Sequence, residues 1–238
     1  MRFQKNYFFL NNWLRSFNFW LLVLLVFSCQ DNQPVNETLV YSNDFEDESM
    51  NGLSINKMSF LSFNESKVLG NANNGGLELF LDQLPNHNYL VISMDLYIHD
   101  SWDGNYNGLT YPINDHDAWV IEFDSAQTRK VSEDIYFETT FSNGPCISYR
   151  CLVQSYPNIY PFVNNPQEGS TTTLPGLCLY ADQLDGTTLY KFEKWFPHDR
   201  QEVSISIYDK LKQSNALDPQ CDESWSIDNL SIKTIKLD

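Results

Sequence analysis

Basic residues are scarce in this sequence. Its 238 residues include 15 lysines and arginines against 31 aspartates and glutamates, a formal net charge of −16 at pH 7. Nucleic-acid binding needs a basic surface that meets the phosphates, so the acid excess excludes nucleic acid as a partner. The same excess repels anionic membranes and attracts cations such as calcium.

Catalytic and metal-binding signatures are also missing. The sequence contains no G-x-S-x-G, H-E-x-x-H or phosphate-binding glycine loop. It has no Cys-x-x-Cys pair, which leaves a zinc ribbon or a thioredoxin-like role without support. Glu122-Phe-Asp124 lacks the second glutamate of the E-x-D-x-x-E pattern of laminarinase-type glycoside hydrolases. We therefore expect a protein that is not an enzyme, although two carboxylates distant in sequence could still meet in the fold.

The N-terminal residues carry the most specific signal. Arg2, Lys5 and Arg15 accompany the apolar run FNFWLLVLLVF, which is too short to span a membrane comfortably. Val26-Phe27-Ser28-Cys29 follows and resembles the lipobox of bacterial lipoproteins, in which the cysteine is lipidated after cleavage. The resemblance implies a signal peptide over residues 1–28, and a lipidated Cys29 with a polar tether over 29–37. A β-sandwich domain would then cover residues 38–238.

This resemblance also implies a location. The polar tether is similar to those of Bacteroidetes-type surface lipoproteins, and Asp124-Ser125-Ala126 matches a short O-glycosylation motif of that group. We expect a cell-envelope protein at the outer membrane, periplasmic or surface-exposed, held in the bilayer through Cys29. The alternative is an uncleaved signal anchor that ends at Cys29.

Four cysteines remain after Cys29. An even number in an exported chain predicts two disulfides among Cys146, Cys151, Cys178 and Cys221. Three connectivities are open. The local pair Cys146–Cys151 would close the loop CISYRC and leave Cys178–Cys221 to join the last strand to the sheet.

Short strand patterns dominate the chain after Thr38. Apolar residues alternate with polar ones in several runs, which are YLVISMDLYI, AWVIEFD, DIYFETTF and VSISIY, with LELFLDQL, LCLYAD and TTLYKFEKWF as further candidates. Aromatic residues make up 15% of the chain, which favours a β-sandwich or barrel. We predict an all-β fold, a single antiparallel β-sandwich of jelly-roll type, with a long excursion from Ser142 to Pro175.

The stretch CDESWSIDNLSI near the C-terminus changes its alternation. Trp225 and Ile227 lie on one face of a strand, whereas Leu230 and Ile232 lie on the other. An extra residue shifts the alternation in this way, so we predict a β-bulge at Asp228-Asn229. Polar side chains inside an otherwise apolar strand need partners, and a cation or backbone amides could supply them.

The two ends of the chain resemble known modules. The opening N-x-F-E-x-x-x-x-N-G (from Asn43) and the closing W-x-I-D-N-x-x-I (from Trp225) are similar to the first and last strands of jelly-roll carbohydrate-binding modules. The closing motif is also similar to that of MAM-type adhesion modules. The resemblance implies that these strands pair and that Asp44, Glu46, Asp228 and Asn229 hold a structural calcium ion. The alternative is that these acids are solvated or cap loops.

A second polar loop, HDSWDGNYNG, is a candidate for either ion or sugar binding. Asp103, Asn105 and Asn107 fit the first half of a calcium loop, while the other interpretation is an Asn/Gly-rich turn. Trp102 and Tyr106 lie in the same loop, and with Trp195 they are the candidate rings for stacking on sugars. Trp119 and Trp225 lie on patterned strands and are expected in the core.

These patterns indicate a binding protein. We expect a cell-envelope lipoprotein whose β-sandwich binds a ligand without catalysis, most readily a polysaccharide. The alternatives are a structural or adhesion lipoprotein that binds an envelope or extracellular protein, and a polysaccharide hydrolase or lyase.

Overall fold

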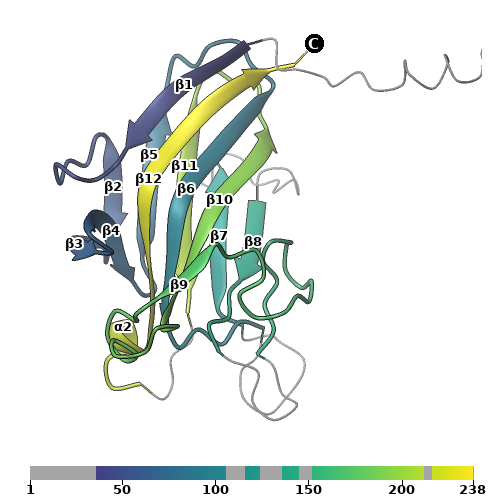
Figure 1. The fold of residues 1–238 in the computed structure, drawn as a ribbon. Coiled ribbons are helices and arrows are strands. Elements are labelled where there is room, and N and C mark those ends of the chain that lie inside the picture. The colour runs from purple at the N-terminus through teal and green to yellow at the C-terminus, as the bar shows by residue number, and fades with distance from the viewer. Residues whose placement is uncertain (1–35, 106–115, 124–135, 145–151, 212–215, 238) are drawn as a thin grey trace, which may run out of the picture. The chain divides into compact units, whose positions relative to one another are not determined.

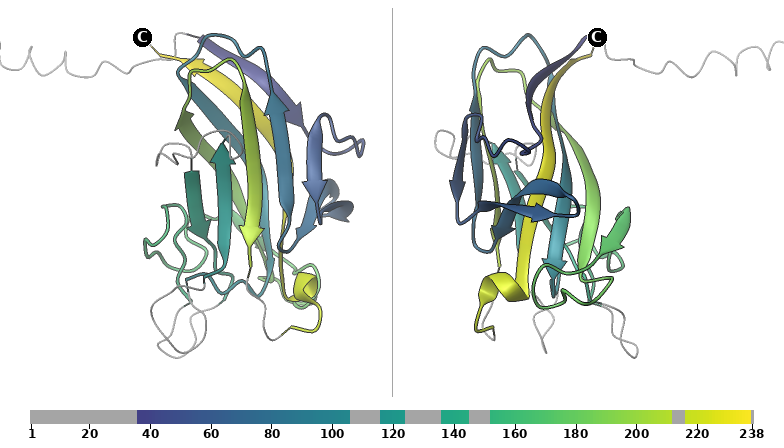
Figure 2. Two further views of the ribbon diagram at one scale, coloured as in Figure 1. Left: turned by 180° about the vertical axis from the view of Figure 1, so that it is seen from behind. Right: turned by 60° about the vertical axis from the view of Figure 1, so that its left-hand side comes forward.

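The alternating runs form two antiparallel sheets in this computed structural model, which describes residues 36–105, 116–123, 136–144, 152–211 and 216–237 (Figure 1). The first sheet has seven strands in the order β3-β4-β12-β6-β10-β9, with β1 also paired to β12. The second has five strands in the order β2-β5-β11-β7-β8 and is seen best from behind (Figure 2). The described part of the chain is therefore an all-β sandwich, which confirms the predicted fold class.

The strands and the single short helix of the described residues have the following bounds: β1 (Asn36–Asn43), β2 (Leu53–Asn56), β3 (Ser59–Phe63), β4 (Ser66–Ala72), β5 (Gly76–Leu81), β6 (Tyr89–Asp100), β7 (Ala118–Phe123), β8 (Tyr136–Thr140), β9 (Thr172–Leu174), β10 (Thr187–Pro197), β11 (Val203–Lys210), α2 (Pro219–Asp222) and β12 (Glu223–Lys236). No helix within these described ranges is long and apolar enough to cross a membrane.

The core lies between the two sheets and uses the predicted faces. Strand β6 contributes every second residue from Leu90 to Ile98, and β11 contributes Val203, Ile205 and Ile207. Trp119 of β7 and Trp225 of β12 are fully buried and meet edge to face, with ring centroids 6.0 Å apart. Each fully buried large apolar side chain contributes about 1.5–3 kcal/mol, so these alternating faces account for the pairing of the sheets.

The bulge predicted in the last strand is present. Pairing between β12 and β6 shifts register between Asp228 and Ser231, and Asn229 has a left-handed backbone with φ of 52°. Asparagine is one of the few residues that adopt this conformation readily. β12 pairs with β4 through Ile227 and with β1 from Leu230 onward. The bulge therefore marks the point at which β12 exchanges one neighbour for another, and Leu230 and Ile232 still reach the core.

One predicted strand is wrong. The run LCLYAD, residues 177–182, forms bends and turns, although its apolar residues alternate. The carboxylate of Asp100 accepts the backbone N–H groups of Cys178 at 3.2 Å and Tyr180 at 2.9 Å. These bonds hold the segment in a turn, because the backbone donors that a strand would use in a ladder point at one side chain.

Candidate functional site

Outward-facing residues of the five-stranded sheet line up in two rows that cross all five strands. Side chains alternate along a strand, so every second residue of each strand faces away from the core. The strand registers place Ser54, Glu78, Ser206, Glu122 and Tyr136 in one row, and Asn56, Gly76, Tyr208, Val120 and Glu138 in the next. We call these two rows the polar face.

A pocket of about 350 Å³ opens on the polar face where the second row contains glycine. Gly76 lies between Asn56 of β2 and Tyr208 of β11 in the strand register. A Cβ atom at Gly76 would lie 2.3 Å from the carbonyl oxygen of Ile207, so β5 and β11 approach too closely for any other residue. The pocket is lined by Ser54, Ile55, Asn56, Asn74, Gly75, Gly76, Leu77, Glu78, Ser206, Tyr208 and Asp209.

The buried Asp209 carboxylate fixes the backbone at the base of this pocket by hydrogen bonds. It accepts the backbone N–H of Asn74 at 2.6 Å and of Gly75 at 3.1 Å, and the indole N–H of Trp225 at 2.7 Å. Burial raises the pKa of Asp209, and these donors act in the opposite direction. Strand β12 is thus linked to the pocket by the hydrogen bond from Trp225 to Asp209.

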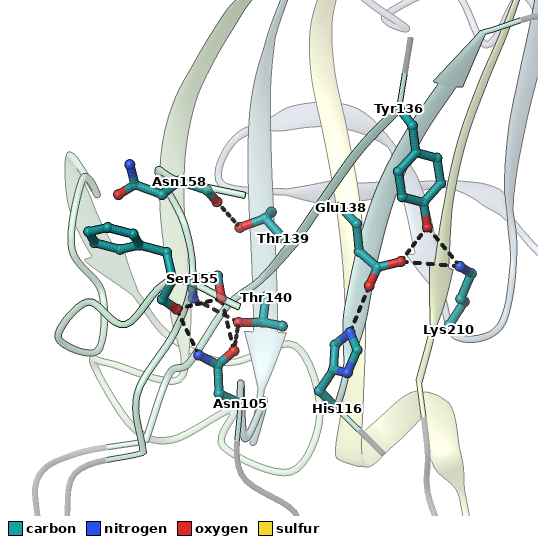
Figure 3. Close-up of polar contacts among 10 residues, drawn as sticks. Asn105, His116, Tyr136, Glu138, Thr139, Thr140, Ser155, Asn158 and Lys210 are labelled. Carbon is teal, nitrogen blue, oxygen red and sulfur yellow. Dashed lines mark hydrogen bonds and ion pairs between the residues drawn. The ribbon is translucent and has the colours of Figure 1, made fainter. Parts of the chain in front are cut away.

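Two tyrosines and a lysine continue the face beyond the pocket. The Tyr208 hydroxyl donates to Glu122 Oε2 at 2.9 Å, and the Tyr136 hydroxyl donates to Glu138 Oε2. Lys210 Nζ donates to the Tyr136 hydroxyl at 3.0 Å and lies 5.6 Å from the ring centroid of each tyrosine. Figure 3 shows Tyr136, Glu138 and Lys210 converging at this end of the sheet. The face therefore alternates aromatic rings with carboxylates.

Glu138 is the most strongly perturbed acid on the polar face. Its Oε1 lies 2.8 Å from His116 Nε2, and its Oε2 accepts from Lys210 as well as Tyr136. The His116 hydrogen bond is the largest cause that lowers the pKa of Glu138 to about 2. The imidazole itself stacks on Tyr160, with centroids 3.7 Å apart and planes 7° apart. Glu138 is consequently an ionised acceptor at neutral pH, whereas burial raises the pKa of Tyr136.

The chain that follows β8 covers the edge of the five-stranded sheet. Within residues 152–168, the backbone N–H of Tyr156 donates to Thr140 O at 3.1 Å, and that of Tyr160 donates to Glu138 O at 2.8 Å. These two bonds continue the sheet by one irregular strand and satisfy part of its edge. They also bring the Tyr160 ring over His116.

The Asn105 side chain bonds to residues at this edge of the sheet. Its Oδ1 accepts the hydroxyls of Thr140 at 2.5 Å and Ser155 at 3.1 Å, and its amide donates to Phe162 O at 3.0 Å (Figure 3). Both lone pairs of the Asn105 oxygen are therefore used by protein donors, which argues against its predicted role as a calcium ligand. Its predicted partner Asn107 lies outside the described residues.

Asp103 of the same predicted loop is half-buried and makes an isolated bridge with Ser142. Burial, with a contribution from the charge of Asp222, raises the pKa of Asp103 to about 6.

The acids predicted at the two chain ends converge in part. Ser66 Oγ lies 2.5 Å from Glu46 Oε1 and 2.9 Å from Asp228 Oδ2, so a hydroxyl brings these carboxylates together. Asp44 instead accepts the N–H of Glu46, and Asn229 donates its side-chain amide to Asp95 at 3.1 Å. In the part of the chain that the structure describes, no three acidic, histidine or cysteine side chains are arranged to hold a metal.

Calcium binding thus remains a prediction of the sequence. It would appear as a rise in melting midpoint when calcium is added and a fall with EDTA, because a ligand of the folded state alone raises the midpoint.

The predicted sugar-stacking rings have different outcomes. Trp102 is fully buried, packs edge to face on Phe141 and donates its indole N–H to Ser224 O at 2.8 Å. Its predicted role as an exposed ring is wrong, because Trp102 itself packs into the core. Tyr106 lies outside the described residues. Trp195 is 45% exposed on the outer side of the seven-stranded sheet, and its prediction as a ligand-binding residue stays open.

One predicted disulfide is confirmed. Cys178 and Cys221 are bonded, with Cα atoms 5.0 Å apart, and they join the turn after β9 to α2 before the last strand. Cys146 and Cys151 lie outside the described residues, as does Cys29, so the second disulfide and the lipidation remain predictions.

The polar face is the site that sequence reasoning missed. Tyr208 and Lys210 extend the run VSISIY, whose outward-facing positions are polar, and Tyr136 and Glu138 occupy the same kind of position in DIYFETTF. An outward tyrosine two residues from an outward charged residue on each run was the available signal. The sequence contains nothing that places the two runs in one sheet.

No protein-family model and no curated protein matches this chain. Among solved structures, it is similar to the CBM22-2 xylan-binding domain of Xyn10C from Paenibacillus barcinonensis, with 10% identity and a TM-score of 0.38 over 82% of this chain and 99% of that one. It is also similar to a CBM28 module specific for non-crystalline cellulose, with 12% identity and a TM-score of 0.30 over 82% of this chain and 90% of that one. Such low values establish no relationship and assign no ligand.

Proposed function

We propose that the protein is a non-catalytic carbohydrate-binding β-sandwich whose ligand lies on the polar face, with the pocket at Gly76 as its main subsite. The observation that carries the proposal is this pocket, which has a tyrosine on one side and hydroxyl, amide and carboxylate groups around it. A sugar ring presents apolar C–H faces that pack on aromatic rings and hydroxyls that bond to such groups.

The polar face is wide enough for more than one sugar unit. Five strands about 4.8 Å apart span about 19 Å from β2 to β8. Beyond the pocket, Glu122, Tyr136 and Lys210 continue the mixture of aromatic and charged groups in the same direction. A short oligosaccharide could therefore cross the strands, with one unit in the pocket and the next beside Tyr136.

The charge state of Glu138 makes it unsuited to act as a catalytic acid. Glycosidases need a carboxylic acid that is protonated at working pH and a second carboxylate nearby. Glu122 and Glu138 are diagonal neighbours on β7 and β8, with about 7–8 Å between such positions. The pKa of Glu138 is lowered to about 2, so it is not a proton donor at neutral pH. Release of reducing sugar by the protein would contradict this part of the proposal.

Protein interaction is the second candidate function, and it has its own surface. Leu39, Lys233, Val91 and Trp195 form one row on the outer side of the seven-stranded sheet. Leu39 is 55% exposed and Trp195 is 45% exposed, so large apolar side chains face solvent there. A partner that co-purifies with the protein and is lost in Trp195→Ala would favour this function.

The envelope location is part of the same proposal and depends on the sequence. Lipidation of Cys29 would tether the sandwich to the outer membrane, where polysaccharides are accessible. Metabolic labelling with a fatty-acid analogue should mark the protein, and Cys29→Ser should abolish the label.

Glycan-array binding followed by titration calorimetry tests the proposed function. Tyr208→Ala should weaken binding at least about fivefold, since truncation of an aromatic group at the centre of a site costs more than about 1 kcal/mol. Trp195→Ala removes an exposed ring from the opposite sheet and should leave the affinity unchanged. Absence of binding to every glycan, or loss of binding in Trp195→Ala alone, would overturn the proposal.

A further inference from the structure

The charged side chains that line the pocket at Gly76 are acidic. Among the described residues that line it there are two carboxylates, Glu78 and Asp209, and no lysine, arginine or histidine. The Asp209 carboxylate is buried and accepts three backbone N–H groups and the Trp225 indole. Glu78 differs, because it is exposed at the pocket and accepts a hydrogen bond from the Ser204 hydroxyl at 3.1 Å. Glu78 is therefore the solvent-exposed carboxylate among the described residues that line the pocket.

The charges around the pocket are mixed, with acids in the majority. Glu122, beside Ser206 in the same row, carries a second carboxylate, which accepts the Tyr208 hydroxyl. Lys57 lies beside Gly75, and the Lys210 ammonium, 5.6 Å from the Tyr208 ring centroid, is paired with Glu138 at 3.3 Å. The net charge of the whole chain, −16, adds a long-range field of the same sign. A negative group in the pocket is repelled, and a positive group is attracted.

We infer that the pocket selects sugars by charge: it binds acidic units less tightly than neutral units, and it holds most tightly a unit with a free amine, which pairs with Glu78. This inference rests on the proposed function, since it assigns a ligand class to the same pocket. Neutral units would bind through Tyr208 and the Ser and Asn side chains. An amine adds one ion pair to those contacts, whereas the carboxylate of a uronic acid meets Glu78 as a like charge.

The expected size of the preference is modest. An exposed ion pair contributes about 0.2–1 kcal/mol, which corresponds to a preference of up to about fivefold for an amine over the matching neutral unit. Salt screens it, because the Debye length falls from about 30 Å at about 0.01 M to about 3 Å at about 1 M. The preference for amine-bearing glycans and the salt dependence of that preference should therefore disappear together when Glu78 is neutralised.

The test uses the full chain on a glycan array that contains neutral glycans, glucosamine oligosaccharides with free amines, and oligogalacturonates. At low salt we expect the tightest binding to amine-bearing glycans, weaker binding to neutral glycans and the weakest to oligogalacturonates, and an amine preference that Glu78→Gln removes. Glu193→Gln makes the same charge change on the outer side of the other sheet, and it should retain the preference.

The outcomes separate the two claims. Binding of oligogalacturonates as tight as that of neutral glycans would overturn the charge selection while leaving the proposed function standing. An amine preference that survives in Glu78→Gln, or that is lost equally in Glu193→Gln, would overturn the assignment to Glu78. Absence of binding to all three classes would overturn the proposed function and this inference with it.

Discussion

Replacement of Glu138 by glutamine should destabilise the sandwich in a pH-dependent way. The carboxylate accepts hydrogen bonds from His116, Tyr136 and Lys210, and the pKa of Glu138 falls from 4.5 to about 2 on folding. That difference corresponds to about 3 kcal/mol at most, and partial solvent exposure reduces the expected contribution to about 2 kcal/mol. A glutamine keeps one acceptor oxygen but turns an NH₂ group toward the remaining donors.

The sign of the pH dependence follows from the lowered pKa of Glu138. An acid whose pKa is lower in the folded state stabilises fully above its unfolded value of 4.5, and this contribution is lost as the pH falls through about 2. Urea unfolding of wild type and Glu138→Gln should therefore differ by about 2 kcal/mol near pH 7, and the difference should shrink steadily below pH 4.5.

Glu122→Gln is the matched control, because it removes a carboxylate that accepts the Tyr208 hydroxyl on the same face. We expect it to lose no more than about 1 kcal/mol. A loss in Glu138→Gln below about 0.5 kcal/mol, or an equal loss at pH 3 and pH 7, would refute the reasoning.

Three further predictions concern the bulge, the disulfide and the base of the pocket. Asn229→Ala should be about 1 kcal/mol less stable to urea than Asn229→Gly, because the backbone φ of 52° costs alanine more than glycine; equal stability would contradict it. Joint replacement of Cys178 and Cys221 by serine should cost about 2–4 kcal/mol in a thermal melt, given their sequence separation of 43, and an unchanged midpoint would contradict it. Asp209→Asn should weaken glycan binding and alter the near-ultraviolet circular dichroism of Trp225, since the asparagine side chain cannot accept hydrogen bonds from all four donors that Asp209 accepts. Wild-type affinity in this variant would show that the pocket does not depend on those four hydrogen bonds.

Local alternation was enough to predict β6, β7, β8, β10 and β11 and the bulge in β12. Ile227 and Leu230 are three residues apart and both reach the core, which a regular strand does not allow. The change of face at Asp228-Asn229 therefore predicts an extra residue without knowledge of the neighbouring strands. The role of the bulge as the junction between β4 and β1 could not be predicted, because it depends on which strands flank β12.

Features that depend on which strands pair could not be predicted from the sequence. Gly76 and Tyr208 form the pocket because β5 and β11 are neighbours in a particular register, and neither residue carries a local signal of the other. Trp102 shows the opposite failure. Its polar neighbours predicted an exposed loop, yet the ring is buried because β12 provides an acceptor for its indole N–H.

The most direct test of the carbohydrate-binding proposal is a map of backbone amides that change when a neutral oligosaccharide binds. Amide exchange or chemical shifts measured with and without the glycan would provide it. We predict changes centred on β5 and β11 around Gly76 and Tyr208, extending toward β7 and β8. Changes confined to the outer side of the seven-stranded sheet around Trp195, or no change at saturating glycan, would contradict it.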